Sequence, residues 1–226
     1  MIRLRNVTKI YNKTYTAIHR LNLHISKDEF VFLVGPTGAG KTTLIKLILR
    51  DILPDSGNIY IDKVKTREFN EKQVSKLRKN IGVIFQDFKL LNRTVYENLA
   101  FVQKIQGEKK KTIKENIDRV ISLVGLENKL GFYPYQLSGG ERQKASLARA
   151  IINSPHILLA DEPTGNLDPD ASWEIIQIMS KINMANTTVV VATHDKTVVD
   201  LMRKRVVAMH GGVILRDQQL GSYHEF

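Results

Sequence analysis

Gly35-Pro36-Thr37-Gly38-Ala39-Gly40-Lys41-Thr42 is the stretch around which the rest of this chain is arranged. It matches the phosphate-loop pattern G-x-x-x-x-G-K-[ST] at every fixed position. The apolar run 30–34 precedes it and the mostly apolar segment 43–49 follows it, which predicts a buried strand, a glycine turn and a helix. Such glycines let backbone N–H groups point at phosphate oxygens, and the start of a helix adds its positive dipole end. The alternative is a glycine turn with no ligand.

This motif gives each of its polar residues an expected task. Lys41 is long enough to reach the outer phosphates of a nucleotide, and the Thr42 hydroxyl is a suitable oxygen ligand for Mg²⁺. Thr43 opens the following helix and adds one more backbone N–H beside the phosphates. We therefore expect residues 35–43 to bind nucleotide phosphates.

The composition is that of a globular protein with anionic partners. The chain has 226 residues, a net charge of +11 and a pI near 9.7, which favours nucleotides, nucleic acids or the inner face of a membrane. No cysteine is present, which excludes a disulfide framework and a thiolate metal site. The densest basic run is Lys109-Lys110-Lys111. We interpret it as a solvated helix start, with membrane-surface attraction as the functional alternative; no nucleic-acid module is recognised.

The sequence predicts no membrane insertion of its own. Residues 1–6 lack the apolar centre of a signal peptide, and no run approaches the roughly 18 apolar residues of a membrane span. Any membrane role is therefore expected to come through a partner protein.

Hydrophobic periodicity predicts an α/β chain. Alternation at 2–8 and 21–25 indicates two antiparallel strands that form a small β layer. Near-continuous apolar runs alternating with helical segments imply a parallel sheet covered on both faces. Further strands are expected at 58–62, 81–85, 156–160, 187–193, 205–209 and 212–215, and helices at 96–103, 113–124, 142–152, 169–182 and 195–203. The segment 63–80 is expected to be a loop with a short helix.

The polar segment between the first two strands carries two tyrosines. A flat aromatic ring in a loop can stack on a base, and we assign Tyr11 to an adenine ring. Tyr15 is an alternative for the same task, and ordinary packing of either ring is the other interpretation.

Three polar residues follow apolar strands downstream. The run 157–160 ends in Asp161 and Glu162, whose side chains should diverge at a strand end. Asp161 is placed to hold Mg²⁺ through water, and Glu162 to activate the water that attacks the γ-phosphate. His194 follows the strand 187–193 and can donate a hydrogen bond to the γ-phosphate or hold that water. An acidic turn and a structural histidine are the simpler alternatives.

A second anion site is predicted at Leu137-Ser138-Gly139-Gly140-Glu141. Ser138 is a good N-cap, and the two glycines expose backbone N–H groups at the start of a helix. One nucleotide needs only one phosphate cradle. The simplest use of the second cradle is therefore to cover the nucleotide held by another subunit.

Together these motifs resemble the ATP-binding-cassette (ABC) ATPases over essentially the whole chain. The order of the motifs also matches. In the terms of that family, Tyr11 looks like the adenine-stacking aromatic, residues 35–42 look like the Walker A loop, and Gln86 looks like the Q-loop. Residues 137–141 look like the signature motif, and residues 157–162 look like Walker B. Residues 166–168, with Asp168, look like the D-loop, and His194 looks like the switch histidine. Two departures are Glu141 in place of the usual Gln, which brings negative charge near a nucleotide, and Lys144 in place of a common Arg, which loses the bidentate fork.

The resemblance implies a fold, two cofactors and a site. The fold is a P-loop NTPase (RecA-like) α/β core with an N-terminal antiparallel layer and an inserted helical subdomain. Within a single domain, 1–226, the core would be 1–87 and 155–226, and the helical subdomain 88–154. ATP and Mg²⁺ would be bound, with Thr42, Gln86 and Asp161 around the metal. Ser138, Gly139, Gly140, Glu141 and Asp168 would act across the interface of an ATP-dependent homodimer.

The resemblance also implies a partner. In transporter-type members the surface that follows the Q-loop, here about 86–101, receives a separate integral membrane protein. The sequence looks most like the members that act in bacterial cell division, which implies an FtsX-like partner, a peripheral place on the cytoplasmic face of the membrane and control of septal cell-wall hydrolysis. The alternatives are an ATPase of a lipoprotein-releasing or macrolide-type exporter, a soluble nucleic-acid-linked ABC ATPase and a catalytically silent subunit. The intact Lys41, Asp161, Glu162 and His194 argue against the last of these.

Overall fold

The core of the molecule is a six-stranded sheet in the order β10-β9-β3-β8-β7-β6. The computed structural model describes residues 1–223. The parallel strands are β3 (Phe30–Val34), β6 (Ile81–Ile84), β7 (Ile157–Asp161), β8 (Thr188–Ala192) and β9 (Arg205–His210), and β10 (Val213–Gln218) adds an antiparallel edge. Every residue of β3 and β8 is buried, as expected for strands covered on both faces. The carboxyl ends of the parallel strands meet at one edge, which is where polar side chains gather.

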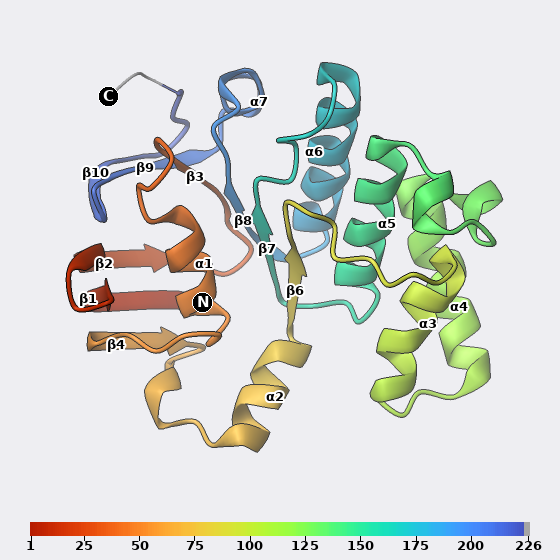
Figure 1. Ribbon diagram of the computed structural model, residues 1–226, viewed down its shortest axis with the longest axis horizontal. Coiled ribbons are helices and arrows are strands. Elements are labelled where there is room, and N and C mark those ends of the chain that lie inside the picture. The colour runs from red at the N-terminus through yellow and green to blue at the C-terminus, as the bar shows by residue number, and fades with distance from the viewer. Residues whose placement is uncertain (224–226) are drawn as a thin grey trace.

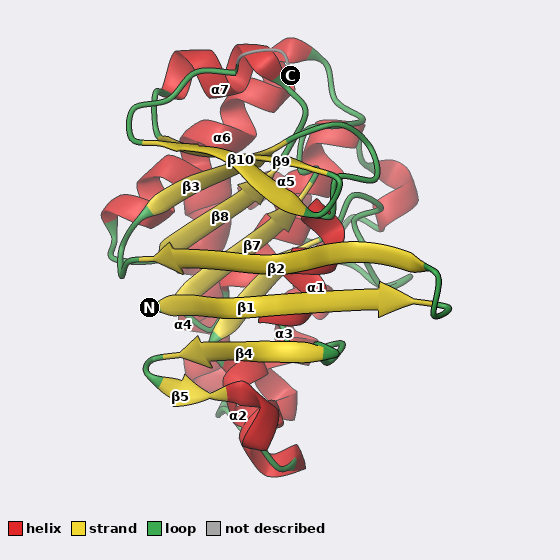
Figure 2. Ribbon diagram, turned by 90° about the vertical axis from the view of Figure 1, so that its left-hand side faces the viewer, coloured by secondary structure: helices red, strands yellow, loops and turns green. Residues whose placement is uncertain are grey.

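A second sheet is antiparallel and lies in front of the first in Figure 2. Its order is β2-β1-β4-β5, with β1 at Ile2–Tyr11, β2 at Tyr15–Ile25, β4 at Ser56–Ile61 and β5 at Val64–Lys65. The predicted β layer is confirmed, and its first two strands are longer than expected. The polar segment expected between these two strands is a turn of residues 12–14, because Asn12 and Lys13 adopt positive φ and reverse the chain sharply.

Helix α1 (Lys41–Ile48) packs between the two sheets. Its buried residues Leu44, Ile45 and Leu47 share one apolar cluster with alternate residues of β3 and with the inner face of β1. On the opposite face of the core sheet a second cluster joins Phe30 and Phe32 to the remaining long helices. Figure 1 shows these helices on the far side of β7 and β8 from α1. The phosphate-loop strand is therefore fixed from both faces.

The inserted helices are α3 (Val95–Ile105), α4 (Lys110–Val124) and α5 (Gly139–Ile151). A capping box of Thr94 and Glu97 begins α3, and Gly125 in the left-handed region ends α4. Helix α5 begins at Gly139, three residues earlier than the expected 142, because Ser138 caps it directly. The chain returns to the core through β7, α6 (Pro169–Met184), β8 and α7 (Lys196–Met202).

The segment 63–80 is more ordered than its charge suggested. It holds β5, a 3₁₀ turn at Thr66–Glu68 and the nine-residue helix α2 (Glu71–Lys79), which begins at a capping box of Asn70 and Gln73. In residues 1–223 no helix combines the length and hydrophobicity needed to cross a bilayer.

Candidate nucleotide-binding site

The phosphate loop joins β3 to α1 in a conformation that only glycine adopts freely. Gly35, Gly38 and Gly40 have φ of 148°, 81° and 103°. A Cβ on Gly40 would lie 2.6 Å from the carbonyl oxygen of Ala17 in β2. The packing of the chain therefore leaves no room for a side chain at Gly40. The loop presents its backbone at the N-terminus of α1.

Lys41 lies folded over this loop. Its side chain is only 8% exposed, and Nζ donates to the carbonyl oxygens of Gly35 at 2.6 Å and Pro36 at 3.3 Å. Nζ also lies 3.6 Å from Oε1 of Glu162. The ammonium is thus held at the mouth of the loop, where phosphate oxygens can replace the carbonyl oxygens as its acceptors.

Asp161 at the end of β7 meets Thr42 at the start of α1. The Thr42 hydroxyl donates to Oδ1 of Asp161 at 3.1 Å. Burial raises the pKa of the Asp161 carboxyl, while the hydrogen bond from Thr42 acts in the opposite direction. Mg²⁺ suits this pair, because a hydroxyl and a partly buried carboxylate are hard oxygen donors and a cation offsets the cost of burying the charge. In the described part of the chain no group of three or more acidic, histidine or cysteine side chains could hold a metal ion.

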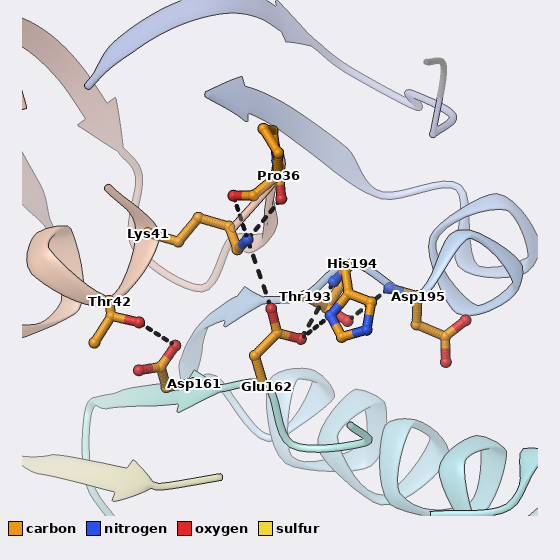
Figure 3. A network of polar contacts seen from close by, with 9 residues as sticks. Pro36, Lys41, Thr42, Asp161, Glu162, Thr193, His194 and Asp195 are labelled. Atoms are coloured by element: carbon orange, nitrogen blue, oxygen red, sulfur yellow. Dashed lines mark hydrogen bonds and ion pairs between the residues drawn. The ribbon is translucent and has the colours of Figure 1, made fainter. Parts of the chain in front are cut away.

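Glu162 turns away from Asp161. Its φ of 50° is in the left-handed region, which non-glycine residues rarely enter, and its N–H donates to the carbonyl oxygen of Ala192 in β8 at 2.9 Å. Oε2 lies 2.8 Å from Nδ1 of His194 and accepts the His194 backbone N–H at 3.3 Å. Figure 3 shows the result: the Glu162 carboxylate lies between Lys41 and His194. The expected divergence of the two carboxylates is confirmed.

A cavity of about 320 Å³ brings most of these groups together. Beside Glu162 and His194 it is lined by Tyr15, residues 36–43 and Gln86. Segments separated by more than 150 residues in the chain thus face one space. Its lining of backbone N–H groups, one ammonium and one carboxylate suits the phosphate end of a nucleotide.

The structure gives the two tyrosines different surroundings. Tyr15 lines the cavity, and its hydroxyl donates to the carbonyl oxygen of Gly38 at 3.1 Å. Tyr11 is absent from the cavity lining; it pairs with Tyr15 across the β1–β2 turn, with Lys9 Nζ 5.7 Å from its ring centre. Adenine stacking by Tyr11 stays a prediction.

The turn before α5 lines a separate hollow of about 280 Å³ with residues 166–168. Ser138 Oγ accepts the Glu141 N–H at 3.2 Å, and Glu141 Oε2 accepts the Ser138 N–H at 2.8 Å. Glu141 Oε1 lies 3.1 Å from Nζ of Lys129. The Ser138 N–H first, and then Lys129, lower the pKa of the Glu141 carboxyl. Glu141 therefore folds back on its own helix, and its charge is paired.

Two further residues of this region are also engaged in the chain's own structure. Asp168 caps α6 by accepting the N–H of Ala171 at 2.9 Å. Lys144 Nζ lies 2.7 Å from Oε2 of Glu174, which ties α5 to α6. Within residues 1–223 the lining of the phosphate-loop cavity and that of this hollow have no residue in common.

A clamp on the segment after Gln86 was not predicted from the sequence. Arg149 of α5 donates to the carbonyl oxygens of Phe88 at 3.0 Å and Lys89 at 2.5 Å, and the Ser146 hydroxyl donates to Phe88 at 3.0 Å. Phe88 and Lys89 both have positive φ. These hydrogen bonds join residues about 60 positions apart, and no local sequence pattern predicts them. Lys129 beside Glu141 was also missed, whereas Tyr15 was named as an alternative.

Comparison with known proteins gives the same family from sequence and from structure. The family model described as ABC transporter matches residues 18–165. The chain is 46% identical over 227 residues to the cell division ATP-binding protein FtsE of Bacillus subtilis (strain 168), covering 100% of both chains. It is 45% identical to the FtsE of Mycobacterium tuberculosis (strain ATCC 25618 / H37Rv), covering 99% of this chain and 98% of the relative.

A solved structure is similar over the same length. It is a dimeric ATP-binding cassette in a post-hydrolysis state, bound to ADP and Pi, with a TM-score of 0.88 and 33% identity over 99% of this chain and 100% of that one. The matched region exceeds half of the chain, and the curated relatives align with it from end to end. The chain belongs to the ABC transporter family of ATPases.

Proposed function

We propose that this ATPase is the nucleotide-hydrolysing subunit of a membrane complex in bacterial cell division, acting with a separate FtsX-like membrane protein to control septal peptidoglycan hydrolysis. The observation that carries this proposal is the end-to-end likeness, at 46% and 45% identity, to relatives named FtsE. The subunit would lie on the cytoplasmic face of the membrane as a peripheral protein.

The site supports hydrolysis by a positioned base. Glu162 would accept a proton from water as the water oxygen bonds to the γ-phosphorus and the bond from phosphorus to the β-phosphate oxygen breaks, releasing ADP and phosphate. His194, 2.8 Å from Glu162, would orient the carboxylate and contact the γ-phosphate. Lys41 would leave its carbonyl acceptors for the outer phosphates. Mg²⁺, when bound near Thr42, Gln86 and Asp161, would neutralise phosphate charge.

A second copy of the chain would complete the site. Ser138, Gly139 and Gly140 line a hollow apart from the phosphate-loop cavity, so one chain does not supply both sides. In a head-to-tail pair these N–H groups would cover the nucleotide of the partner copy, with Asp168 near the interface. ATP binds the paired state better than the open state, so pairing would follow the nucleotide.

The clamp on the Gln86 segment offers a route for this motion. Gln86 faces the cavity, and two residues later the chain is held by Arg149 and Ser146 of α5. Helix α5 begins at Gly139 and is capped by Ser138. A shift of Gln86 on nucleotide binding would therefore move the same helix that carries the second cradle.

A cleft of about 900 Å³ supports a membrane partner. It opens between α2 and α3 and is lined by Phe85, Phe101, Val102 and Ile105, with Arg149 behind them. Of the predicted partner surface at 86–101 only Phe101 lines this cleft; the lining extends to 105 and across to α2. Ile105 and Phe101 are 66% and 38% exposed, which leaves apolar surface for an inserted segment of another protein.

The decisive test of hydrolysis by paired copies is Glu162→Gln. We expect turnover to fall by about 10²- to 10⁴-fold because the base is lost, while ATP affinity is retained. With ATP the variant should elute as a dimer in gel filtration, and with ADP as a monomer. Glu115→Gln makes the same change at an exposed carboxylate outside the cavity and is the matched control, which should keep wild-type turnover. Wild-type turnover in Glu162→Gln, or a monomer at saturating ATP, would contradict the proposal.

The partner surface is tested by Phe101→Ala with Ile105→Ala. We expect co-purification with an FtsX-like membrane protein to be lost while the ATPase of the isolated subunit is kept. Leu215→Ala on β10 is the control, because Leu215 is also exposed, at 58%, and lies outside the cleft. Equal loss of ATPase and of binding would mean that these side chains serve packing instead. Stable co-purification with an exporter permease would favour the alternative function.

A further inference from the structure

Lysine and arginine are enriched in two segments, α2 with the residue after it and the stretch from the end of α3 into α4. Residues 71–80 contain four basic residues and one acidic residue, and 104–119 contain six basic and three acidic. These two short segments thus hold a large part of the net charge of +11. The positive charge is therefore concentrated in α2 and in the segment from the end of α3 into α4.

Seven lysines of these two segments are exposed and have no ion-pair partner among the described residues. We call them the basic rim: Lys72, Lys76, Lys79, Lys104, Lys109, Lys110 and Lys114. Among residues 1–223 none of the seven has a carboxylate within ion-pair distance. Their positive charge is therefore available to an external anion.

The start of α4 is an unfavourable place for such charge. Helix N-termini carry partial positive charge and favour acidic residues. Helices α2, α3 and α5 follow this rule, with a capping box and a glutamate in the first turn. Helix α4 has neither: Lys109 occupies its N-cap position without a capping bond, Lys110 and Lys111 follow, and no acidic residue lies in its first turn. The lysines do not stabilise the helix, which favours a ligand outside the chain.

The cleft lies between α2 and α3, and of the seven rim lysines Lys79 lines it. Lys79 of α2 and Ile105 of α3 line the same cleft. In Figure 1, α2 and the connection from α3 to α4 both lie toward the lower edge of the molecule. The exposed side chains of Phe101 and Ile105 lie on the cleft wall, and Lys104 directly precedes Ile105 in α3. Exposed apolar side chains surrounded by lysines are the pattern of a surface that rests on a lipid headgroup layer.

We propose that the basic rim binds the anionic lipid headgroups of the bilayer that contains the membrane partner. This inference rests on the proposed function in one respect, the orientation of the chain at the membrane. If the cleft receives a membrane protein, the groups near its opening face the lipid. Lipid contact would hold the cleft toward the membrane before the protein partner is engaged. It would also raise the local concentration of the subunit beside that partner.

Vesicle sedimentation with the full chain tests the proposal without any membrane protein. The probes are vesicles of phosphatidylcholine and vesicles that also contain phosphatidylglycerol. We expect binding only to the second kind, and weaker binding as salt is raised. Lys72→Gln with Lys110→Gln should lower the partition coefficient by roughly 10- to 30-fold. Lys27→Gln with Lys181→Gln removes the same charge elsewhere and should lower it by no more than about twofold.

Several outcomes would overturn the proposal. Equal binding to both vesicles would exclude headgroup charge, and equal losses in the two double variants would assign the effect to net charge. A short DNA duplex that binds through the same lysines, with no vesicle binding, would assign the rim to nucleic acid. No binding of the unsubstituted chain to the vesicles that contain phosphatidylglycerol, with intact co-purification of the membrane partner, would overturn this inference alone. Intact vesicle binding with no ATP-driven pairing would instead overturn the proposed function.

Discussion

The phosphate loop and the turn before α5 are both glycine-containing cradles at helix N-termini, yet they are built differently. In the phosphate loop the glycines have positive φ, Gly35 and Gly40 pack closely against β9 and β2, and Lys41 lies beside Glu162. In the second cradle Gly139 and Gly140 are ordinary helical residues, and the local charges of Glu141 and Lys129 pair with each other. The first cradle is complete within one chain. The second has bare N–H groups and no charge of its own to offer, which suits a cover for a nucleotide held elsewhere.

The largest contrast is expected between two lysines. Lys41→Ala should weaken ATP binding by roughly 100-fold or more, because hydrogen bonds to charged groups contribute about 1.5–3 kcal/mol each. Lys144→Ala, beside the second cradle, should leave the affinity of a single chain unchanged, since Lys144 is paired with Glu174. Titration with a fluorescent ATP analogue measures both. Undiminished affinity in Lys41→Ala would contradict the assignment of the phosphate loop.

Two glycine substitutions sharpen the comparison further. In Gly40→Ala the new Cβ meets the Ala17 carbonyl at 2.6 Å in a left-handed conformation, so we expect the free energy of unfolding to fall by about 2–4 kcal/mol. In Gly139→Ala the Cβ lies 3.4 Å from Leu167, an ordinary contact, and alanine favours the helix by up to about 1 kcal/mol. Urea denaturation distinguishes the two.

Gly139→Ala should therefore be at least as stable as the wild type and yet hydrolyse ATP more slowly. Its methyl group would stand between the N–H groups of α5 and the nucleotide of the second copy. Turnover measured against protein concentration shows whether pairing is impaired. A stable variant with full turnover would mean that the glycine is not needed for a partner, and the comparison of the two cradles would fail.

The difference between the cradles also explains what the sequence could predict. The strand, turn and helix around 35–42 were predictable, because the glycines, Lys41 and the apolar flanks are neighbours in the chain. The positive φ of Glu162 could not be predicted, because it depends on a hydrogen bond to Ala192 in another strand. The direction of Glu141 was left open, although its capping box with Ser138 is a local pattern; its pairing with Lys129, twelve positions upstream, follows from no local pattern.

The segment after Gln86 shows a similar limit. Its aromatic and apolar residues predicted a partner surface, but Leu90 packs against the hydrophobic core and the clamp by Arg149 comes from 60 positions away. Where a sequence has no hydrophobic periodicity, it does not distinguish apolar residues that will be buried from those that will be exposed. Only the cleft distinguishes Phe101 and Ile105, which line it, from Leu90.

The smallest expected effect concerns Glu141. The Ser138 N–H and Lys129 lower the pKa of its carboxyl, so the ionised form stabilises the fold. This contribution is fully present above the ordinary glutamate pKa of about 4.3 and is lost as pH falls through the lowered value. Glu141→Gln keeps the capping oxygen and loses the charge, so its stability should depend less on pH below about pH 4.

At neutral pH the cost of Glu141→Gln should be below about 1 kcal/mol, because the pair with Lys129 is partly exposed and the capping oxygen is kept. ATP-driven pairing should persist, since Glu141 folds back on α5 and leaves the Gly139 and Gly140 N–H groups open. Urea denaturation across pH and gel filtration with ATP measure the two effects. Loss of pairing without loss of stability would show that the carboxylate reaches the partner's nucleotide, and the second cradle would then carry a charge of its own.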